Sequence, residues 1–346
     1  MVMTRMDQHQ TRTSNPPSDP LIDSYGRIHT SLRLSVTDRC NIRCTYCMPE
    51  TNPKFFAREE LLTFEELERV ASLLVQRCGI RDIRITGGEP LVRKNLSELV
   101  AKLAGIPELK DLSLTTNGLL LRDHAEDLKR AGLQRLNISL DTLSGDTFKK
   151  ITRREGLQKT LEGIEQAVKV GFSSIKLNAL AIKGITEKEI CRLVQYASAH
   201  GLTIRFIEYM PLDTDRAWQR ENVLDGDQIL SILKAKFGRV TPLERRESSQ
   251  PAEEFKIGDH HVGIIRSITQ PFCNQCNRLR ITADGSLRNC LFAEDEVSFK
   301  QRLREGINDD QLVEMFRLSV AAKAAAHGIN DSTFRQPNRP MYAIGG

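Results

Sequence analysis

The stretch LRLSVTDRCNIRCTYCMP, residues 32–49, joins a strand-like run to three closely spaced cysteines. In the run at 32–37, apolar residues alternate with polar ones, as they do in a half-buried strand. The cysteines are Cys40, Cys44 and Cys47, with the spacing C-x3-C-x2-C, and the aromatic Tyr46 precedes the last of them. The sequence therefore predicts three thiols in the loop that leaves a first strand.

Five further strand-like runs alternate with helical patterns. The runs lie at 82–86, 111–116, 135–141, 174–182 and 203–211, and the helical patterns at 63–79, 95–105, 123–132, 156–171 and 186–201. Strands and helices that alternate in this way form parallel β/α units with right-handed crossovers. Six units predict an α/β fold that is a partial (β/α)6 TIM-like barrel, and an open doubly wound sheet is the alternative.

Small and polar residues gather where these runs end. The endings read TDRC, TGGEP, TTNG, SLD and EYMP. In parallel β/α folds ligands bind at the carboxyl ends of the strands, because the loops there vary without disturbing the core. The cysteine loop therefore belongs to the predicted binding edge.

Composition narrows the class of protein. The hydrophobic fraction of 40% and the charged fraction of 27% are those of a soluble globular protein, and no run approaches about 18 apolar residues. Residues 1–24 lack an apolar core, so they predict a disordered leader and no secretory signal. We expect a cytoplasmic protein whose eight cysteines stay reduced. A net charge of +5 is too mild to indicate nucleic acid.

Three chemistries compete for the first cysteine group. A structural zinc site needs four ligands, so a fourth would have to come from elsewhere. A redox pair would use Cys44 and Cys47 and leave Cys40 unexplained. An iron–sulfur cluster held by three thiolates keeps one iron open for chemistry. The position at a strand end favours the cluster.

The pattern changes near residue 240. A polar stretch with short strand-like runs follows, with a hairpin that turns at Asp284-Gly285, and then helical patterns at 296–304 and 309–325. We divide the chain into a leader at 1–24, a barrel core at 25–240 and a C-terminal segment at 241–346.

The C-terminal segment carries a second cysteine group. Cys273, Cys276 and Cys290 have the spacing C-x2-C-x13-C. A zinc knuckle is the structural alternative, but no fourth ligand stands beside them, and three thiolates again indicate a cluster with one open iron. Cys78 and Cys191 lie on helical faces and are predicted to be buried core residues.

The cysteine spacing of the first group resembles that of the radical S-adenosylmethionine (SAM) superfamily, and TGGEP at 86–90 resembles its second motif. Together with FCNQCNRLR and a terminal Gly-Gly, these motifs make the chain similar to the GTP 3′,8-cyclases of molybdenum-cofactor biosynthesis over about residues 25–346. Asn95 departs from the aspartate that is common in this family at that position.

The resemblance implies a radical SAM lyase with SAM and two 4Fe–4S clusters as cofactors. The first cluster would bind SAM and the second the guanine of GTP. A 5′-deoxyadenosyl radical would take hydrogen from the ribose C3′, and the C3′ radical would attack C8 of the base. Reduction would give 3′,8-cyclo-7,8-dihydro-GTP. The C-terminal segment would close the barrel mouth.

The resemblance also implies roles for individual residues. The first cluster would be held by Cys40, Cys44 and Cys47, and the second by Cys273, Cys276 and Cys290. SAM contacts are expected from Tyr46, Gly88, Glu89, Ser139, Asn178 and Met210. GTP contacts are expected from Arg33, Arg84, Thr115, Lys176, Arg278 and Arg280. The tail residues Gly345 and Gly346 would reach the active site and assist catalysis.

The residues themselves support one part of this assignment. Arg33, Arg84 and Lys176 interrupt otherwise apolar strands, and inward positions of a barrel can be polar when a ligand fills them. A triphosphate would need such charges.

The resemblance further implies an external electron donor and a downstream cyclic pyranopterin monophosphate synthase that takes the product. We expect no nucleic acid, no membrane, and a monomer or homodimer. Two alternatives stay open: another radical SAM enzyme with an auxiliary cluster that acts on a peptide, and a zinc-stabilised binding module.

Overall fold

The computed structural model describes residues 17–346, and its centre is a curved parallel sheet. Its first six strands are β1 Ser31–Ser35, β2 Asp82–Thr86, β3 Asp111–Thr116, β4 Arg135–Ser139, β5 Ser174–Ala181 and β6 Thr203–Glu208. Each pairs in parallel with the next along the chain. The predicted partial barrel is confirmed.

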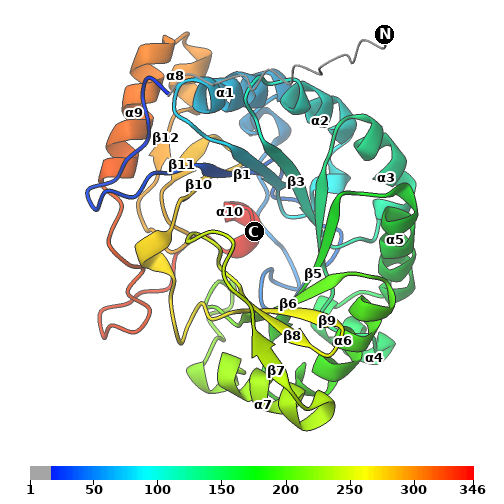
Figure 1. Cartoon of the computed structure of the whole chain (residues 1–346). Helices are drawn as coiled ribbons and strands as arrows, with labels where there is room; N and C mark the ends of the chain where they lie inside the picture. The colour runs from blue at the N-terminus through cyan, green and yellow to red at the C-terminus, as the bar shows by residue number, and fades with distance from the viewer. Residues whose placement is uncertain (1–16) are drawn as a thin grey trace, which may run out of the picture.

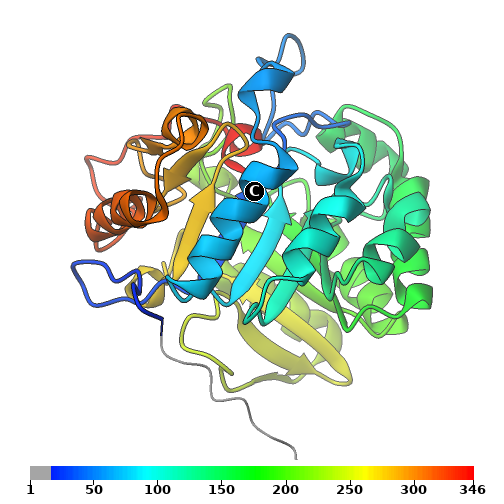
Figure 2. The ribbon, with the colours of Figure 1, turned by 90° about the horizontal axis from the view of Figure 1, so that it is seen from above.

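The helices cover the outside of this curve (Figure 1; Figure 2, from above). They are α1 Phe64–Gln76, α2 Leu96–Ala104, α3 Leu121–Arg130, α4 Gly145–Thr152, α5 Leu157–Val170, α6 Ile190–Ala199 and α7 Gly226–Phe237. α1 begins where the Thr63 hydroxyl accepts from the Glu66 N–H while the Glu66 carboxylate accepts from the Thr63 N–H. A doubly wound sheet would carry helices on both faces, so that alternative is wrong.

The chain after residue 240 extends the same sheet at both edges, which the sequence did not predict. Its strands are β7 Val240–Pro242, β8 Glu253–Ile257, β9 His260–Ile265, β10 Arg278–Ile281, β11 Ser286–Arg288 and β12 Val297–Ser298. β9 pairs in parallel with β6, and β10 pairs in parallel with β1. The hairpin predicted at Asp284-Gly285 is confirmed by the antiparallel pair β10–β11.

Three helices complete the chain: α8 Lys300–Arg304, α9 Asp309–Ala321 and α10 Met341–Ile344. α9 packs beside α1, where Arg77 forms an ion pair with Asp310 at 2.7 Å. α10 lies inside the curve of the sheet, so the C-terminus is in the mouth of the barrel (Figure 1).

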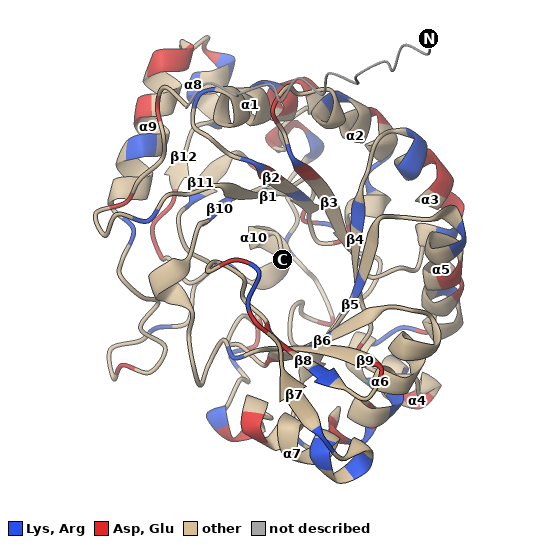
Figure 3. Ribbon diagram, in the orientation of Figure 1, with Lys and Arg blue, Asp and Glu red and all other residues tan. Residues whose placement is uncertain are grey.

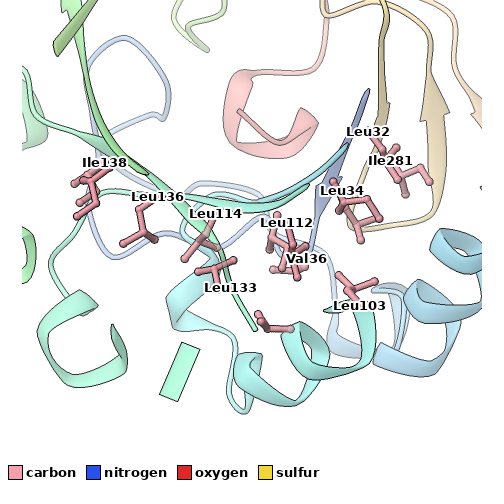
Figure 4. Close-up of a cluster of buried hydrophobic side chains, with 14 of the residues drawn as sticks. Leu32, Leu34, Val36, Leu103, Leu112, Leu114, Leu133, Leu136, Ile138 and Ile281 are labelled. Carbon is pink, nitrogen blue, oxygen red and sulfur yellow. The ribbon is translucent and has the colours of Figure 1, made fainter. Parts of the chain in front are cut away.

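The main core lies between the sheet and the outer helices. Figure 4 shows Leu32, Leu34, Leu112, Leu114 and Ile281 on this outer face of the strands, with α10 on the opposite face. The residues between them in the strands, such as Arg33 and Ser113, point the other way because side chains alternate along a strand. The inner face therefore carries polar side chains that a ligand could contact.

Three predictions about local structure need correction. Residues 1–16 of the predicted leader lie outside the described residues, but disorder is wrong for residues 17–24, because Leu21 is fully buried and Asp19 pairs with Arg77. The helix predicted at 296–304 is only α8, preceded by β12. Cys78 is buried as predicted, whereas Cys191 is half-buried on α6 and not a core residue.

Candidate active site

The first cysteine group lines a cavity of about 220 Å³ at the carboxyl end of the barrel. Cys40, Cys44 and Cys47 all face it. The N–H groups of Cys47 and Met48 both donate to the carbonyl oxygen of Cys44 at 3.0 Å, and this tight turn brings the second and third thiols to one wall. The described structure thus places the three predicted thiols together.

Burial controls the ionisation of these thiols. Desolvation raises the pKa of Cys40 to about 11 and that of Cys47 to about 12, and it also raises the pKa of Cys44 well above its ordinary value. A thiolate is the form that binds metal, so these three sites favour the anion only when a cation or cluster compensates its charge.

The loop after β2 closes against the cysteine loop. A Cβ on Gly88 would lie 2.5 Å from the carbonyl oxygen of Arg39, so only glycine allows this approach. The Glu89 N–H then donates to that same oxygen at 2.8 Å. The two glycines of TGGEP therefore let the second motif touch the first.

Glu89 is buried with its carboxylate held by three donors. It accepts from the Leu91 N–H at 3.0 Å, the Thr116 hydroxyl at 2.8 Å and the Asn117 N–H at 2.7 Å. Desolvation nevertheless raises the pKa of Glu89 to about 7. A buried carboxylate with this pKa is poised to receive a cationic or hydrogen-bonding ligand.

The remaining predicted residues of this cavity are also present. Its wall includes Tyr46, Ser139, Asn178 and Met210. The Tyr46 hydroxyl donates to Asp141 at 2.7 Å, and this carboxylate also accepts from the Leu180 N–H at 2.8 Å. Asp141 was missed as a site residue, although the SLD ending of its strand was the available signal.

The second cysteine group lines a neighbouring cavity of about 210 Å³. Cys273 begins a short 3-10 turn, Cys276 lies two residues before the start of β10, and Cys290 lies two residues after the end of β11. Desolvation opposes ionisation of Cys276, but the charges of Lys323 and Arg278 outweigh it and lower the pKa of this thiol. Desolvation raises the pKa of Cys273.

Neither cysteine group is shaped for one ion. Within residues 17–346, no three His, Cys, Asp or Glu side chains converge closely enough to hold a single metal ion. Thiolates on one zinc ion lie about 2.3 Å from it and so roughly 3.8 Å from one another. Each set of three thiols offers the donor atoms that an iron–sulfur cluster with one open iron would need.

Arginines stand in a row on the inner face of three neighbouring strands. Arg33 of β1 lies beside Arg280 of β10 on one side and Arg84 of β2 on the other, in exact register. All three line the second cavity, together with Arg278. Figure 3 shows the basic positions of the chain in blue. The Nε of Arg84 is buried without a partner in the described structure.

Burial makes these charges costly in the absence of an anion. Desolvation, reinforced by neighbouring arginines, lowers the pKa of Arg84 to about 10, and desolvation lowers that of Arg280 to about 9. A guanidinium stays protonated near neutral pH, so a bound anion would offset this cost. The row is therefore suited to bind an anion.

Two basic residues depart from the sequence prediction. Lys176 points to the inside of the barrel but lines neither cavity; desolvation lowers its pKa to about 8. Arg205 lines the second cavity and donates to Asn178 at 3.0 Å. Arg205 was missed, although it interrupts its apolar strand just as Arg33 and Arg84 do.

The chain end lies where the two cavities meet. Gly346 and Met341 line both, as do the predicted residues Thr115, Asn178 and Met210. Gly345 lines neither, but its carbonyl oxygen accepts a hydrogen bond from Arg280. At a φ of +89° a Cβ on Gly345 would lie 2.6 Å from the Cβ of Ser35, so the passage admits only glycine.

Comparisons with known proteins match this architecture. Residues 34–197 match the model of the Radical SAM superfamily, and residues 202–329 match the model described as Molybdenum Cofactor Synthesis C. No helix of the described residues is long and apolar enough to cross a membrane.

Relatives align with nearly the whole chain. It is 56% identical over 335 residues to the GTP 3′,8-cyclase of Rhodopirellula baltica, and this alignment covers 95% of this chain and 93% of that protein. It is 44% identical over 328 residues to the GTP 3′,8-cyclase of Streptomyces coelicolor, with 94% and 96% covered. The crystal structure of Streptococcus suis SuiB bound to S-adenosylmethionine shares the fold, with a TM-score of 0.54 at 13% identity over 92% of this chain and 76% of that one.

Proposed function

The chain belongs to the GTP 3′,8-cyclase family of radical SAM enzymes, and we propose that its two adjoining cavities hold SAM and GTP side by side. Its reaction is the conversion of GTP to 3′,8-cyclo-7,8-dihydro-GTP, the first step of molybdenum-cofactor biosynthesis. The single observation that carries the proposal is the contact between the cavities. Thr115, Asn178 and Met210 line both, so two ligands would meet there.

The two thiol sets fit two 4Fe–4S clusters. Cys40, Cys44 and Cys47 would hold the first, and Cys273, Cys276 and Cys290 the second, each with one iron free of protein ligands. When bound, the first cluster supplies the electron that splits SAM into methionine and a 5′-deoxyadenosyl radical. The protein residues bind and orient the ligands and keep water away.

The first cavity offers matching contacts for SAM. The buried Glu89 carboxylate and the Gly88 backbone would take the amino group, since they lie against the cysteine loop. Ser139 and Asn178 offer polar side chains, while Met210 is apolar and Tyr46 is held by Asp141. A wall that combines polar and apolar groups suits an amino acid joined to a nucleoside.

The second cavity offers matching contacts for GTP. Arg33, Arg84, Arg278 and Arg280 would bind the triphosphate, because an anion relieves the buried guanidinium charges. Thr115 stands where both ligands meet and would contact GTP there. Lys176 would act on the phosphates through its charge alone, since it does not line the wall.

The fixed positions of the cavities provide the catalytic geometry. The ribose C3′–H must face the deoxyadenosyl carbon, and Gly346 and Met341 line both cavities at the junction where these atoms would meet. Misplacement by about 1 Å can slow such a step about 100-fold. We assign Gly345 and Gly346 to this positioning.

The family implies an external electron donor and a downstream cyclic pyranopterin monophosphate synthase for the product. We propose that the protein is cytoplasmic and acts as a monomer or homodimer.

The decisive experiment is anaerobic incubation of the reconstituted protein with SAM, a reductant and GTP, followed by mass spectrometry. We expect 5′-deoxyadenosine and a cyclised nucleotide that keeps the triphosphate. Deoxyadenosine formed with a peptide but not with GTP would assign another radical SAM activity. Colourless protein with two zinc ions would overturn the enzyme assignment.

A further inference from the structure

A buried lysine stands directly behind the second cysteine group. Lys323 follows α9, and only 4% of its surface is exposed. Its ammonium donates to the Sγ of Cys276 at 3.4 Å and to the carbonyl oxygen of Arg278 at 3.0 Å, and it lies 2.9 Å from Nε2 of His29. A lysine ammonium has three N–H donors, so each of them has a partner.

His29 fixes the direction of this ammonium. The imidazole is fully buried, and because an ammonium can only donate, Nε2 must be the acceptor. The proton then sits on Nδ1, which has no partner in the described structure. Held by one ring nitrogen and one carbonyl oxygen, the third N–H is aimed at the sulfur of Cys276.

The charge of Lys323 lacks a carboxylate partner. Within residues 17–346, no Asp or Glu forms an ion pair with it; Asp23 pairs instead with Arg27 at 2.6 Å. A buried cation without an anion is costly. Of the three groups that Lys323 touches, only the Cys276 sulfur can carry negative charge. The site is therefore built for a thiolate.

The first cysteine group differs in the donors that reach its sulfurs. The Nδ2 of Asn117 approaches the Sγ of Cys40 at 3.8 Å, which is a contact from a neutral amide. In the described residues no lysine or arginine donates a hydrogen bond to the sulfurs of Cys40, Cys44 or Cys47. The guanidinium of Arg278, by contrast, adds a second cation 4.0 Å from Cys276.

We propose that Lys323 is a positioning residue that orients Cys276 and raises the reduction potential of the cluster held by Cys273, Cys276 and Cys290. This inference rests on the proposed function, which places a cluster there. Reduction adds one negative charge to a cluster, so a nearby cation and an N–H···S bond stabilise the reduced form. Lys323 acts through Cys276 and need not touch either substrate.

The test measures the potential of the second cluster alone. Full-length protein carrying Cys40→Ser, Cys44→Ser and Cys47→Ser is reconstituted anaerobically, and a redox titration is followed by electron paramagnetic resonance. Lys323→Met keeps the apolar stem and removes the charge, whereas Lys323→Arg keeps the charge. Lys102→Met makes the same chemical change on α2, where the ammonium pairs with Glu68.

We expect the midpoint potential to become more negative in Lys323→Met, and to stay near that of the parent in Lys323→Arg and Lys102→Met. An unchanged potential in Lys323→Met would overturn the inference alone. Loss of the cluster from Lys323→Met with retention in Lys323→Arg would support it, since the charge distinguishes the two. Loss of the cluster from both Lys323→Met and Lys323→Arg would overturn the inference, because the site would then require the size and shape of lysine and not its charge. A parent protein that binds no iron would overturn the proposed function as well.

Discussion

The Nη1 of Arg280 donates a hydrogen bond to the carbonyl oxygen of Gly345. A buried arginine that lines the second cavity therefore also holds the penultimate residue of the chain. An anion bound to this guanidinium would be coupled to the position of the tail.

The first prediction concerns the fit of Gly345. Gly345→Ala should lower GTP cyclisation strongly, because the new Cβ would lie 2.6 Å from Ser35 and its φ of +89° disfavours alanine. Gly184→Ala is the matched control: its φ is +75°, but nothing lies within 4 Å. Product formation by mass spectrometry compares the two. Equal losses would mean that backbone strain, and not the passage, matters.

The second prediction concerns the tail as a whole. Deletion of Gly345-Gly346, or addition of one bulky residue after Gly346, should preserve both clusters and slow SAM cleavage but remove cyclisation. A synthetic peptide of the last several residues should restore part of the activity. Iron content and deoxyadenosine provide the controls. Full cyclisation by the truncated protein would assign no catalytic part to the tail.

The third prediction separates the two roles of Arg280. Arg33 and Arg280 should each contribute a charge-assisted contact, so that alanine at either position weakens GTP binding by about 1.5–3 kcal/mol, or about 10- to 100-fold. The side chain of Arg33 donates no hydrogen bond within residues 17–346, so Arg33→Ala should recover cyclisation at saturating GTP. Arg280→Ala should not, because it also releases Gly345.

The controls for the arginine variants change the kind of charged group at the site or remove an arginine far from it. Arg278→Ala should weaken GTP binding to a similar extent, and Arg280→Lys should rescue poorly, since an ammonium cannot form a planar bidentate contact. Arg69→Ala removes a largely exposed ion pair with Asp309 and should leave binding unchanged. If equilibrium binding is unaltered in Arg33→Ala, Arg278→Ala and Arg280→Ala, the phosphates bind elsewhere.

The fourth prediction separates the two cysteine groups. Alanine at Cys40, Cys44 or Cys47 should abolish deoxyadenosine formation, because SAM loses its open iron. Alanine at Cys273, Cys276 or Cys290 should leave slow SAM cleavage and remove cyclisation. Chromatography of deoxyadenosine beside the nucleotide product distinguishes the outcomes. Deoxyadenosine from a first-group variant would contradict the radical SAM assignment.

The fifth prediction is a pH dependence of stability from Glu89. Its pKa is about 7 in the folded protein and 4.5 in a free side chain. Between these values the folded protein keeps a proton that the unfolded chain has lost, so stability falls as pH rises from about 4.5 to 7. The corresponding free energy is on the order of 3 kcal/mol.

Glu89→Gln tests this dependence because glutamine cannot ionise. Its amide fits the surrounding N–H donors less well, which shifts the melting temperature by an amount independent of pH. The melting temperature of the variant minus that of the parent should therefore be larger at pH 8 than at pH 5. Both proteins are measured anaerobically without SAM. A constant difference across this range would mean that Glu89 ionises normally.

Much of the barrel could be predicted because its strands carry a strong local pattern. The runs at 82–86 and 111–116 coincide with β2 and β3, since apolar side chains face the helices and polar ones face inward. The pairing of β10 with β1 and of β9 with β6 could not be predicted. Those partners lie far apart in sequence, and no local pattern specifies a sheet edge.

The residues of the candidate site also differ in whether a local sequence pattern could identify them. Fixed spacing identified both cysteine groups, and interrupted strands identified Arg33 and Arg84. The same signal was present at Arg205 and was not used. Lys323 carried no signal, because its partners His29 and Cys276 are brought to it only by the folded chain.

The edge pairing of β1 also has a consequence for synthesis. During translation β1 leaves the ribosome about 240 residues before β10, its partner on one side. Until β10 arrives, the nascent barrel has an open strand edge, which is a template for pairing with other chains. Growing chains of this protein should therefore depend on chaperones, or on slow synthesis at a low concentration of other chains. Fragments that stop before residue 278 should aggregate.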